Sequence, residues 1–188
     1  MFDELLQNRP GITTVLFTIN PKQNDSIFDL TPQVYFGNGY VKERLDDFVF
    51  KIGPISFFQT NTYQAGMLYR TVRDMARLSG TETVYDLYCG AGSIGIFVSR
   101  LAKKIFGIEL ISEAIADAKE NALLNNVTNA VFFSGDVTDI CTEELMNKEG
   151  KPDIIITDPP RAGMHEKLVK KLLEIAAPKI IYVSCNPA

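Results

Sequence analysis

From residue 61 onward, short apolar segments alternate with longer segments whose apolar residues recur at helical spacing. The short segments are apolar on both faces, which is typical of parallel strands covered by helices. This alternation predicts a doubly wound α/β sheet with right-handed crossovers. We expect strands at Thr83–Tyr88, Lys104–Ile108, Ala130–Phe133, Asp153–Thr157 and Lys179–Ser184. We expect helices at Tyr63–Leu78, Ser93–Ala102, Ser112–Asn125, Val137–Met146 and His165–Ala176.

The first sixty residues carry a β pattern instead. We expect strands at Ile12–Ile19, Gln33–Phe36, Tyr40–Leu45 and Phe48–Ile52. The turn Gly37-Asn38-Gly39 tolerates positive φ and predicts a hairpin between the second and third of these strands. The chain is therefore predicted to have a small β-rich segment at 1–60 and an α/β domain at 61–188.

Composition excludes several classes of protein. The chain has 188 residues, of which 46% are hydrophobic and 22% charged, and this excludes collagen-like and disordered chains. No apolar run approaches about 18 residues, and no basic segment precedes an apolar one at the N-terminus, so neither a membrane span nor a secretory signal is expected. Three widely spaced cysteines favour a reducing compartment, and we expect a cytoplasmic protein. The net charge of −4 argues against a chain that grips long nucleic acid by itself.

Ligands of a doubly wound sheet bind at the carboxyl ends of its strands. The first strand runs into Asp86-Leu87-Tyr88-Cys89-Gly90-Ala91-Gly92, where Gly90 and Gly92 permit a tight turn and close approach of a ligand. The second strand ends at Glu109, 17 residues after Gly92, where a carboxylate can accept both hydroxyls of a ribose. Gly90 to Gly95 match a nicotinamide fingerprint literally, whereas Asp86-x-x-Cys89 is typical of an S-adenosylmethionine site. A purely structural turn remains the alternative for these glycines.

The fourth and fifth strands also end in polar motifs. Asp158-Pro159-Pro160 is a rigid loop, because proline fixes φ, and it projects the Asp158 carboxylate toward the ligand crevice unless that side chain only caps the next helix. The fifth strand runs into Ser184-Cys185-Asn186-Pro187, which makes Cys185 a candidate nucleophile facing the crevice. Cys89 and Cys141 are interpreted as small packed hydrophobes.

Together these motifs resemble the RNA uracil-C5 methyltransferases that modify transfer and ribosomal RNA. The motifs are Phe57-Phe58-Gln59-Thr60-Asn61, Asp86 to Ser93, Asp158 to Gly163, and Ser184-Cys185-Asn186-Pro187, and they match in order and spacing over Ile12–Ala188. The first and last are fairly specific to this family, while the glycine loop is shared by most class I methyltransferases. The resemblance implies S-adenosyl-L-methionine as cofactor, RNA as substrate, and an α/β methyltransferase domain at 61–188 that lacks its last strands.

The resemblance also implies roles for individual residues. Those expected to contact the cofactor are Gln59, Tyr88, Gly90, Gly92, Glu109 and Asp158. Cys185 resembles the nucleophile that adds to C6 of uracil and so makes C5 reactive. Ser93 stands where the transfer-RNA branch has a cofactor-binding asparagine, which favours 23S ribosomal RNA, with transfer RNA as the alternative.

Other residues have open assignments. A reactive thiolate needs a cationic or dipolar neighbour, for which Arg161 is a candidate, and Phe57 or Phe58 could stack on a target base that has left its stack. The family's proton acceptor is expected beyond Ala188, so no general base is assigned and an inactive cofactor-binding fragment stays an alternative. No iron–sulfur or other metal site is expected, and His165 is expected to face solvent.

Three further enzyme classes fit less well. Cytosine-C5 methyltransferases usually have cysteine directly after Pro-Pro, where this chain has Arg161. Enzymes that methylate amino groups prefer an aromatic residue at that place. An NAD-dependent dehydrogenase would leave Cys185 and the Asp158-Pro159-Pro160 loop unexplained. The sequence does not indicate an oligomeric state.

Overall fold

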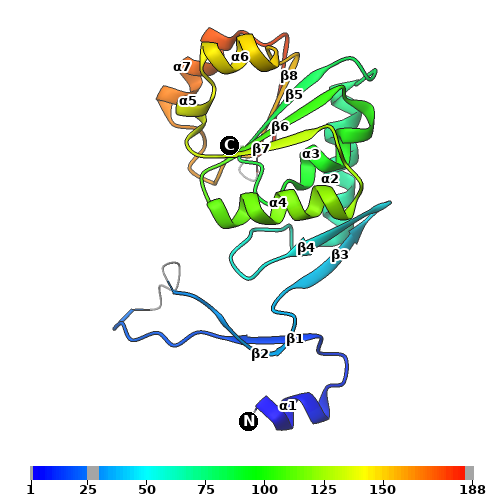
Figure 1. Cartoon of the computed structure of the whole chain (residues 1–188), viewed down its shortest axis with the longest axis vertical. Helices are drawn as coiled ribbons and strands as arrows, with labels where there is room; N and C mark the ends of the chain where they lie inside the picture. The colour runs from blue at the N-terminus through cyan, green and yellow to red at the C-terminus, as the bar shows by residue number, and fades with distance from the viewer. Residues whose placement is uncertain (1, 25–29, 185–188) are drawn as a thin grey trace.

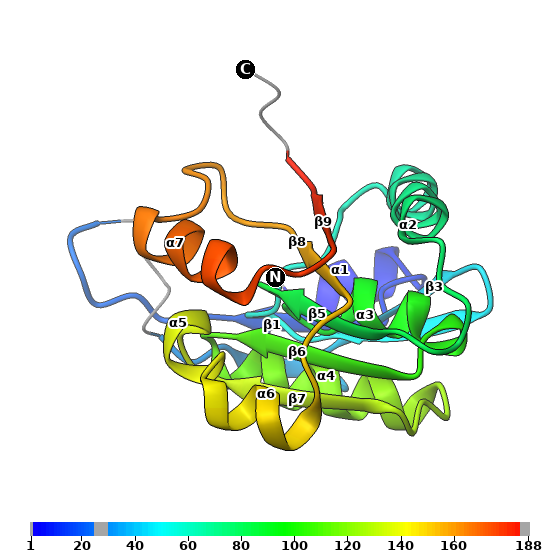
Figure 2. The ribbon, with the colours of Figure 1, turned by 90° about the horizontal axis from the view of Figure 1, so that it is seen from above.

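A parallel five-stranded sheet forms the centre of the computed structural model, which describes residues 2–24 and 30–184. The strand order is β7-β6-β5-β8-β9, so the winding direction reverses between β5 and β8 (Figures 1 and 2). The bounds are β5 Thr83–Leu87, β6 Lys104–Glu109, β7 Ala130–Ser134, β8 Ile154–Thr157 and β9 Lys179–Tyr182. The predicted doubly wound α/β fold is confirmed, and a ligand site is expected where the order reverses.

Helices cover both faces of this sheet, as the views in Figures 1 and 2 show. One face packs against α2 (Thr62–Ala76), α3 (Ser93–Val98) with the 3-10 turn η1 (Ser99–Leu101), and α4 (Ser112–Leu124). The other face packs against α5 (Val137–Ile140), α6 (Glu143–Glu149) and α7 (Glu166–Ile175). Side chains of β5 alternate between the two cores: Val84 belongs to the first, and Tyr85 and Leu87 belong to the second. This alternation explains why the strands are apolar on both faces.

The predicted helix Val137–Met146 is wrong in one respect, because it is two helices. The break falls at Cys141-Thr142, where the Thr142 hydroxyl accepts a hydrogen bond from the Leu145 amide at 3.1 Å and caps α6. A threonine side chain that bonds the backbone in this way favours a helix start over a helix interior.

The first sixty residues form two separate strand pairs. β1 (Thr14–Phe17) pairs with β2 (Gln33–Gly37), and β3 (Val41–Leu45) pairs with β4 (Phe48–Ile52), both antiparallel. The predicted hairpin between the second and third strands is therefore wrong. The Thr14 hydroxyl donates to the Phe36 carbonyl at 3.0 Å and accepts from the Gly39 amide at 2.9 Å, which directs the chain away from β2 at this turn. The helix α1 (Phe2–Asn8) was not predicted, and it packs Phe2 on Tyr35 with ring centroids 4.9 Å apart.

The hairpin of β3 and β4 shares a core with the large sheet. Leu45, Phe48 and Phe50 are buried in the same cluster as residues of α2, α3 and α4. The division into 1–60 and 61–188 stays a prediction. Among the helices of residues 2–24 and 30–184, none combines the length and apolar character needed to cross a bilayer.

Candidate cofactor and active site

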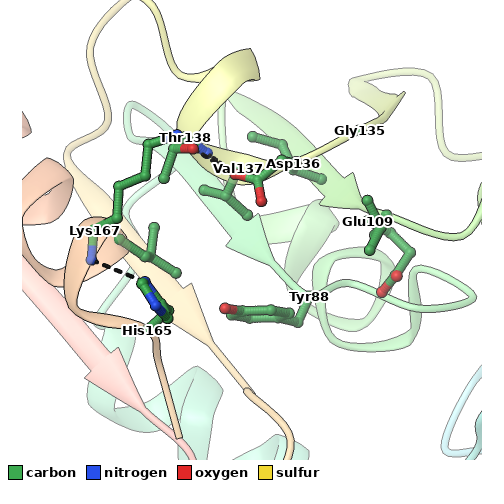
Figure 3. Close-up of a pocket in the computed structure, with 11 residues that line it drawn as sticks. Tyr88, Glu109, Gly135, Asp136, Val137, Thr138, His165 and Lys167 are labelled. Carbon is green, nitrogen blue, oxygen red and sulfur yellow. Dashed lines mark hydrogen bonds between the residues drawn. The ribbon is translucent and has the colours of Figure 1, made fainter.

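Two hollows meet at the carboxyl ends of the central strands, and Tyr88 lines both. The larger one, of about 130 Å³, lies between the ends of β6 and β7 and the start of α7, as Figure 3 shows. The smaller one, of about 30 Å³, lies between the end of β5, the start of α3 and the Phe57-Phe58-Gln59 segment. The predicted residues Gln59, Tyr88, Gly90, Glu109 and Asp158 thus line hollows at one edge of the sheet.

The turn after β5 is built from left-handed backbone conformations. Tyr88, Gly90 and Gly92 have φ angles of 59°, 52° and 77°. A β-carbon on Gly92 would lie 3.0 Å from both the Ala118 side chain and the Phe132 ring, so a larger residue would collide there. Tyr88 is not a glycine, and the left-handed region costs it of order 1 kcal/mol. This conformation carries its ring into the larger pocket (Figure 3).

Glu109, at the end of β6, braces this turn from the neighbouring strand. One carboxylate oxygen accepts from the Gly90 amide at 3.2 Å, and the other accepts from the Ile111 amide at 3.0 Å. The side chain is half-buried and lines the larger pocket. Each carboxylate oxygen has lone-pair capacity beyond one backbone bond, so Glu109 can still accept from a ligand hydroxyl.

The end of β7 contributes a residue that the sequence analysis missed. Asp136 lies just past the carboxyl end of β7, as Glu109 lies at the carboxyl end of β6, and this similar position was the available signal. Its carboxylate accepts from the amide and hydroxyl of Thr138 at 2.7 and 2.6 Å, which lowers the pKa of Asp136 (Figure 3). Across the pocket, His165 is exposed as predicted and begins α7 by accepting from the Lys167 amide at 3.2 Å.

The smaller pocket is acidic. Asp86 is only 1% exposed, and one of its oxygens accepts from the Gly95 amide at 2.8 Å. Its other oxygen, Oδ1, has no hydrogen-bond partner among the described residues. Burial, together with the nearby Asp158 and Glu109 charges, raises the pKa of Asp86 to about 7. Burial also raises the pKa of the half-buried Asp158, so the pocket suits a cationic group.

A pair of hydroxyls faces these carboxylates. The Tyr69 and Ser93 hydroxyl oxygens lie 2.8 Å apart, and both residues line the smaller pocket. Burial raises the pKa of Tyr69 to about 12, so this hydroxyl stays protonated. Since one hydrogen serves the shared bond, the pair keeps a second O–H for a ligand. Tyr69 was missed because a buried tyrosine in a helix carries no signal of function in the sequence.

The Phe57-Phe58-Gln59 segment closes the same pocket from outside the large sheet. Phe58 packs on Phe50 with ring centroids 5.7 Å apart, whereas Phe57 is 71% exposed at the pocket's rim. Gln59 is half-buried and lines the pocket together with Gly90 and Asp158.

The structure describes two of the three cysteines. Cys89 and Cys141 are buried, and burial raises the pKa of both thiols, that of Cys141 to about 11, which agrees with packing roles. Cys185, the predicted nucleophile, lies outside the described residues. The Arg161 side chain, proposed as its cationic neighbour, is exposed after the Asp158 loop.

Comparison with known proteins supports a single family. Residues 31–188 match the family model described as tRNA (uracil-5-)-methyltransferase. An uncharacterized RNA methyltransferase of Bacteroides thetaiotaomicron is 50% identical over 192 residues, covering 100% of this chain and 42% of that protein. A second one, from Porphyromonas gingivalis, is 49% identical and covers 95% of this chain and 38% of that protein.

A solved structure is similar as well. The tRNA (uracil-54, C5)-methyltransferase of Pyrococcus abyssi, in complex with S-adenosyl-L-homocysteine, has a TM-score of 0.78 and 33% sequence identity to this chain. The match covers 97% of this chain and 43% of that one. The chain thus spans about two fifths of the length of these relatives. With a family model matched over 31–188, the chain belongs to the tRNA (uracil-5-)-methyltransferase family.

Proposed function

We propose that this chain carries the cofactor site and nucleophile of an S-adenosylmethionine-dependent RNA uracil-C5 methyltransferase. The observation that carries the proposal is that Gln59, Tyr88 and Asp158 line one hollow with Asp86, whose buried Oδ1 has no partner among the described residues, while Tyr88 and Glu109 line the hollow beside it. The sequence predicted Gln59, Tyr88, Glu109 and Asp158 as cofactor residues, but it did not predict the unpaired oxygen of Asp86. The Pyrococcus relative, which holds S-adenosyl-L-homocysteine, supports the choice of cofactor.

The residues present fit S-adenosylmethionine. An ammonium group would satisfy the unpaired oxygen of Asp86 and relieve the mutual repulsion of Asp86 and Asp158. Glu109 would accept the ribose hydroxyls, and the larger pocket beside Asp136 and Val137 would take the base. When bound, the cofactor supplies an electrophilic methyl group on a positively charged sulfur.

The nucleobase chemistry assigns a role to Cys185. C5 of uracil is a weak nucleophile, and we propose that the Cys185 thiolate adds to C6. The new C–S bond moves the C5–C6 π electrons into an enolate, so C5 becomes nucleophilic. After C5 has gained its methyl group, a base removes the C5 proton and the returning electron pair expels the thiolate. The exposed ring of Phe57 at the rim offers a stacking surface for a uracil that has left its stack.

We propose 23S ribosomal RNA as the substrate, in the cytoplasm. The support is Ser93, which stands where transfer-RNA enzymes of the family have asparagine and which here pairs with Tyr69. Transfer RNA is the second candidate, favoured by the description of the family model and by the substrate named for the Pyrococcus relative.

Trapping of a covalent adduct tests the nucleophile. Fluorine at C5 cannot leave as a proton does, so RNA containing 5-fluorouridine should hold the enzyme after methyl transfer. We expect the full-length protein to form a denaturation-resistant adduct that mass spectrometry maps to Cys185. The Cys185→Ala variant should form none, whereas Cys141→Ala, which changes a buried thiol in the other core, should form it normally. An adduct that persists in Cys185→Ala would exclude this nucleophile.

A further inference from the structure

Two residues of α4 and its C-cap residue bind the backbone that leads from β4 to Phe57. Asp117, Asn121 and Asn125 are spaced by four residues and therefore share one side of the helix. Asp117 accepts from the Ser56 hydroxyl at 2.6 Å and from the Gly53 amide at 3.3 Å. Each of these side chains thus binds a different part of residues 49–56.

The two asparagine side chains form the hydrogen bonds to β4 that a neighbouring strand would form. The Asn125 amide accepts from the Val49 N–H at 2.8 Å and donates to the Val49 carbonyl at 2.7 Å. Asn121 does the same for Lys51, at 2.7 and 3.0 Å. Both main-chain groups of two alternate residues of β4 are thereby satisfied, as they would be by an antiparallel strand.

Asn121 differs from Asn125 in one contact. It is fully buried, and its amide nitrogen also donates to the Ala91 carbonyl at 3.1 Å, inside the glycine turn. The corresponding extra bond of Asn125 stays within the helix, to the Asn121 carbonyl at 2.8 Å. Asn121 uses both amide hydrogens, so a single side chain ties β4 to the glycine turn.

This tie spans two walls of the smaller pocket. One wall is the glycine turn with Gly90, and the other is the Phe57-Phe58-Gln59 segment that β4 leads into. The separation of these walls depends on how β4 sits against α4 and on where the Ala91 peptide lies. A shift of either wall would move Gln59 relative to Gly90.

We propose that Asn121 is a positioning residue for the cofactor site, because it fixes the glycine turn relative to the segment that carries Gln59. This inference rests on the proposed function, in which both walls contact S-adenosylmethionine. Asn121 need not contact the cofactor itself. Loss of its amide should weaken cofactor binding beyond what loss of stability alone explains.

The test compares Asn121→Ala with Asn125→Ala in the full-length protein. Both variants remove two bonds to β4, but only the first releases the Ala91 carbonyl. Calorimetry with S-adenosylhomocysteine, at a temperature where each variant is folded, should show a Kd raised about tenfold or more for Asn121→Ala. Asn125→Ala should stay within about twofold of the unchanged protein although its melting temperature also falls. Exchange of the Gly92 amide hydrogen should accelerate only in the first variant.

The outcomes separate this inference from the proposed function. If the unchanged protein does not bind S-adenosylhomocysteine, the proposed cofactor site is wrong. If it binds, and the two variants have equal Kd values and equal Gly92 exchange, Asn121 has a structural role only and this inference is wrong. Should Asn121→Ala fail to fold, Asn121→Ser, which keeps one hydroxyl donor, replaces it with the same criteria.

Discussion

The burial and the raised pKa of Asp86 are the most informative properties of the site. A carboxylate that is 1% exposed, with one unpaired oxygen and a raised pKa, destabilises the protein that holds it. Such a group is typical of binding and catalytic sites, where the partner comes from the ligand. Its place beside Asp158 and the Tyr69 and Ser93 hydroxyls gives the pocket both an acidic side and a donor side.

The pH dependence of stability tests the burial of Asp86. Because its pKa rises from 3.8 to about 7 on folding, the folded state binds more protons than the unfolded state between these values. The free energy of unfolding therefore falls as pH rises through this window. Asp86→Asn removes the titration, so the melting temperature of the variant minus that of the unchanged protein should increase by about 3 °C or more between pH 5 and pH 8.

A matched control uses Asp136, which lines the larger pocket. Asp136 is exposed, and its pKa is lowered by the Thr138 hydroxyl and amide, so it is ionised throughout this pH range. For Asp136→Asn, the melting temperature difference should stay constant from pH 5 to pH 8. A constant difference for Asp86→Asn as well would contradict the burial of an ionisable Asp86.

Among the elements, α3 lies very close to the sheet, and Gly95 makes this possible. A β-carbon at Gly95 would lie 2.9 Å from the Asp86 carboxylate and 2.9 Å from the Ile105 side chain. This close approach lets the Gly95 amide reach Asp86. The third glycine of the G-x-G-x-x-G match therefore serves helix packing here.

Gly95→Ala should push α3 away from β5. We expect a loss of about 1–3 kcal/mol in the free energy of unfolding, measured by urea denaturation, as for other overpacked cores. Gly11→Ala is the control, since nothing lies within 4 Å of a β-carbon at Gly11 and its φ is not positive. It should leave stability unchanged within about 0.5 kcal/mol or raise it slightly. Equal effects of the two substitutions would show that the close packing is not as described.

The elements also show what the sequence could predict. Apolar periodicity predicted the five parallel strands and their helices, because burial on both faces leaves a strong pattern in the sequence. The pairing of β2 with β1 rather than β3 was not predictable, because it depends on the Thr14 hydroxyl binding the turn at Gly39, 25 residues away. The ties from Asn121 and Asn125 to β4 are equally long-range, at 70 and 76 residues.

The residues of the candidate site were also predictable only in part. Residues at or just past the carboxyl ends of strands, such as Glu109 and Asp158, were predictable because position in the fold determines where they lie. Tyr69 and Asn121 were not, since each acts from the buried side of a helix, where packing and function look alike in the sequence. Gln59 was predicted from the resemblance alone, and the structure brings it to the pocket that Gly90 and Asp158 line.

In the whole molecule, the candidate site lies at one edge of the sheet, and the family match covers residues 31–188. The net charge of −4 provides no general attraction for RNA, so the RNA recognition that we propose would depend, within this chain, on local features such as the exposed Phe57 ring. The two RNA methyltransferase relatives are more than twice as long as this chain. Contacts with RNA elsewhere in the full-length protein are therefore compatible with the net negative charge of this chain.

The most direct test of the account is mass spectrometry of RNA nucleosides from cells that lack the full-length protein. The account predicts that 5-methyluridine disappears from one position of 23S ribosomal RNA. The position should regain its methyl group when the unchanged gene is restored, but not when Cys185→Ala is restored. Unchanged 5-methyluridine in both ribosomal and transfer RNA, or full recovery with Cys185→Ala, would contradict the central claim.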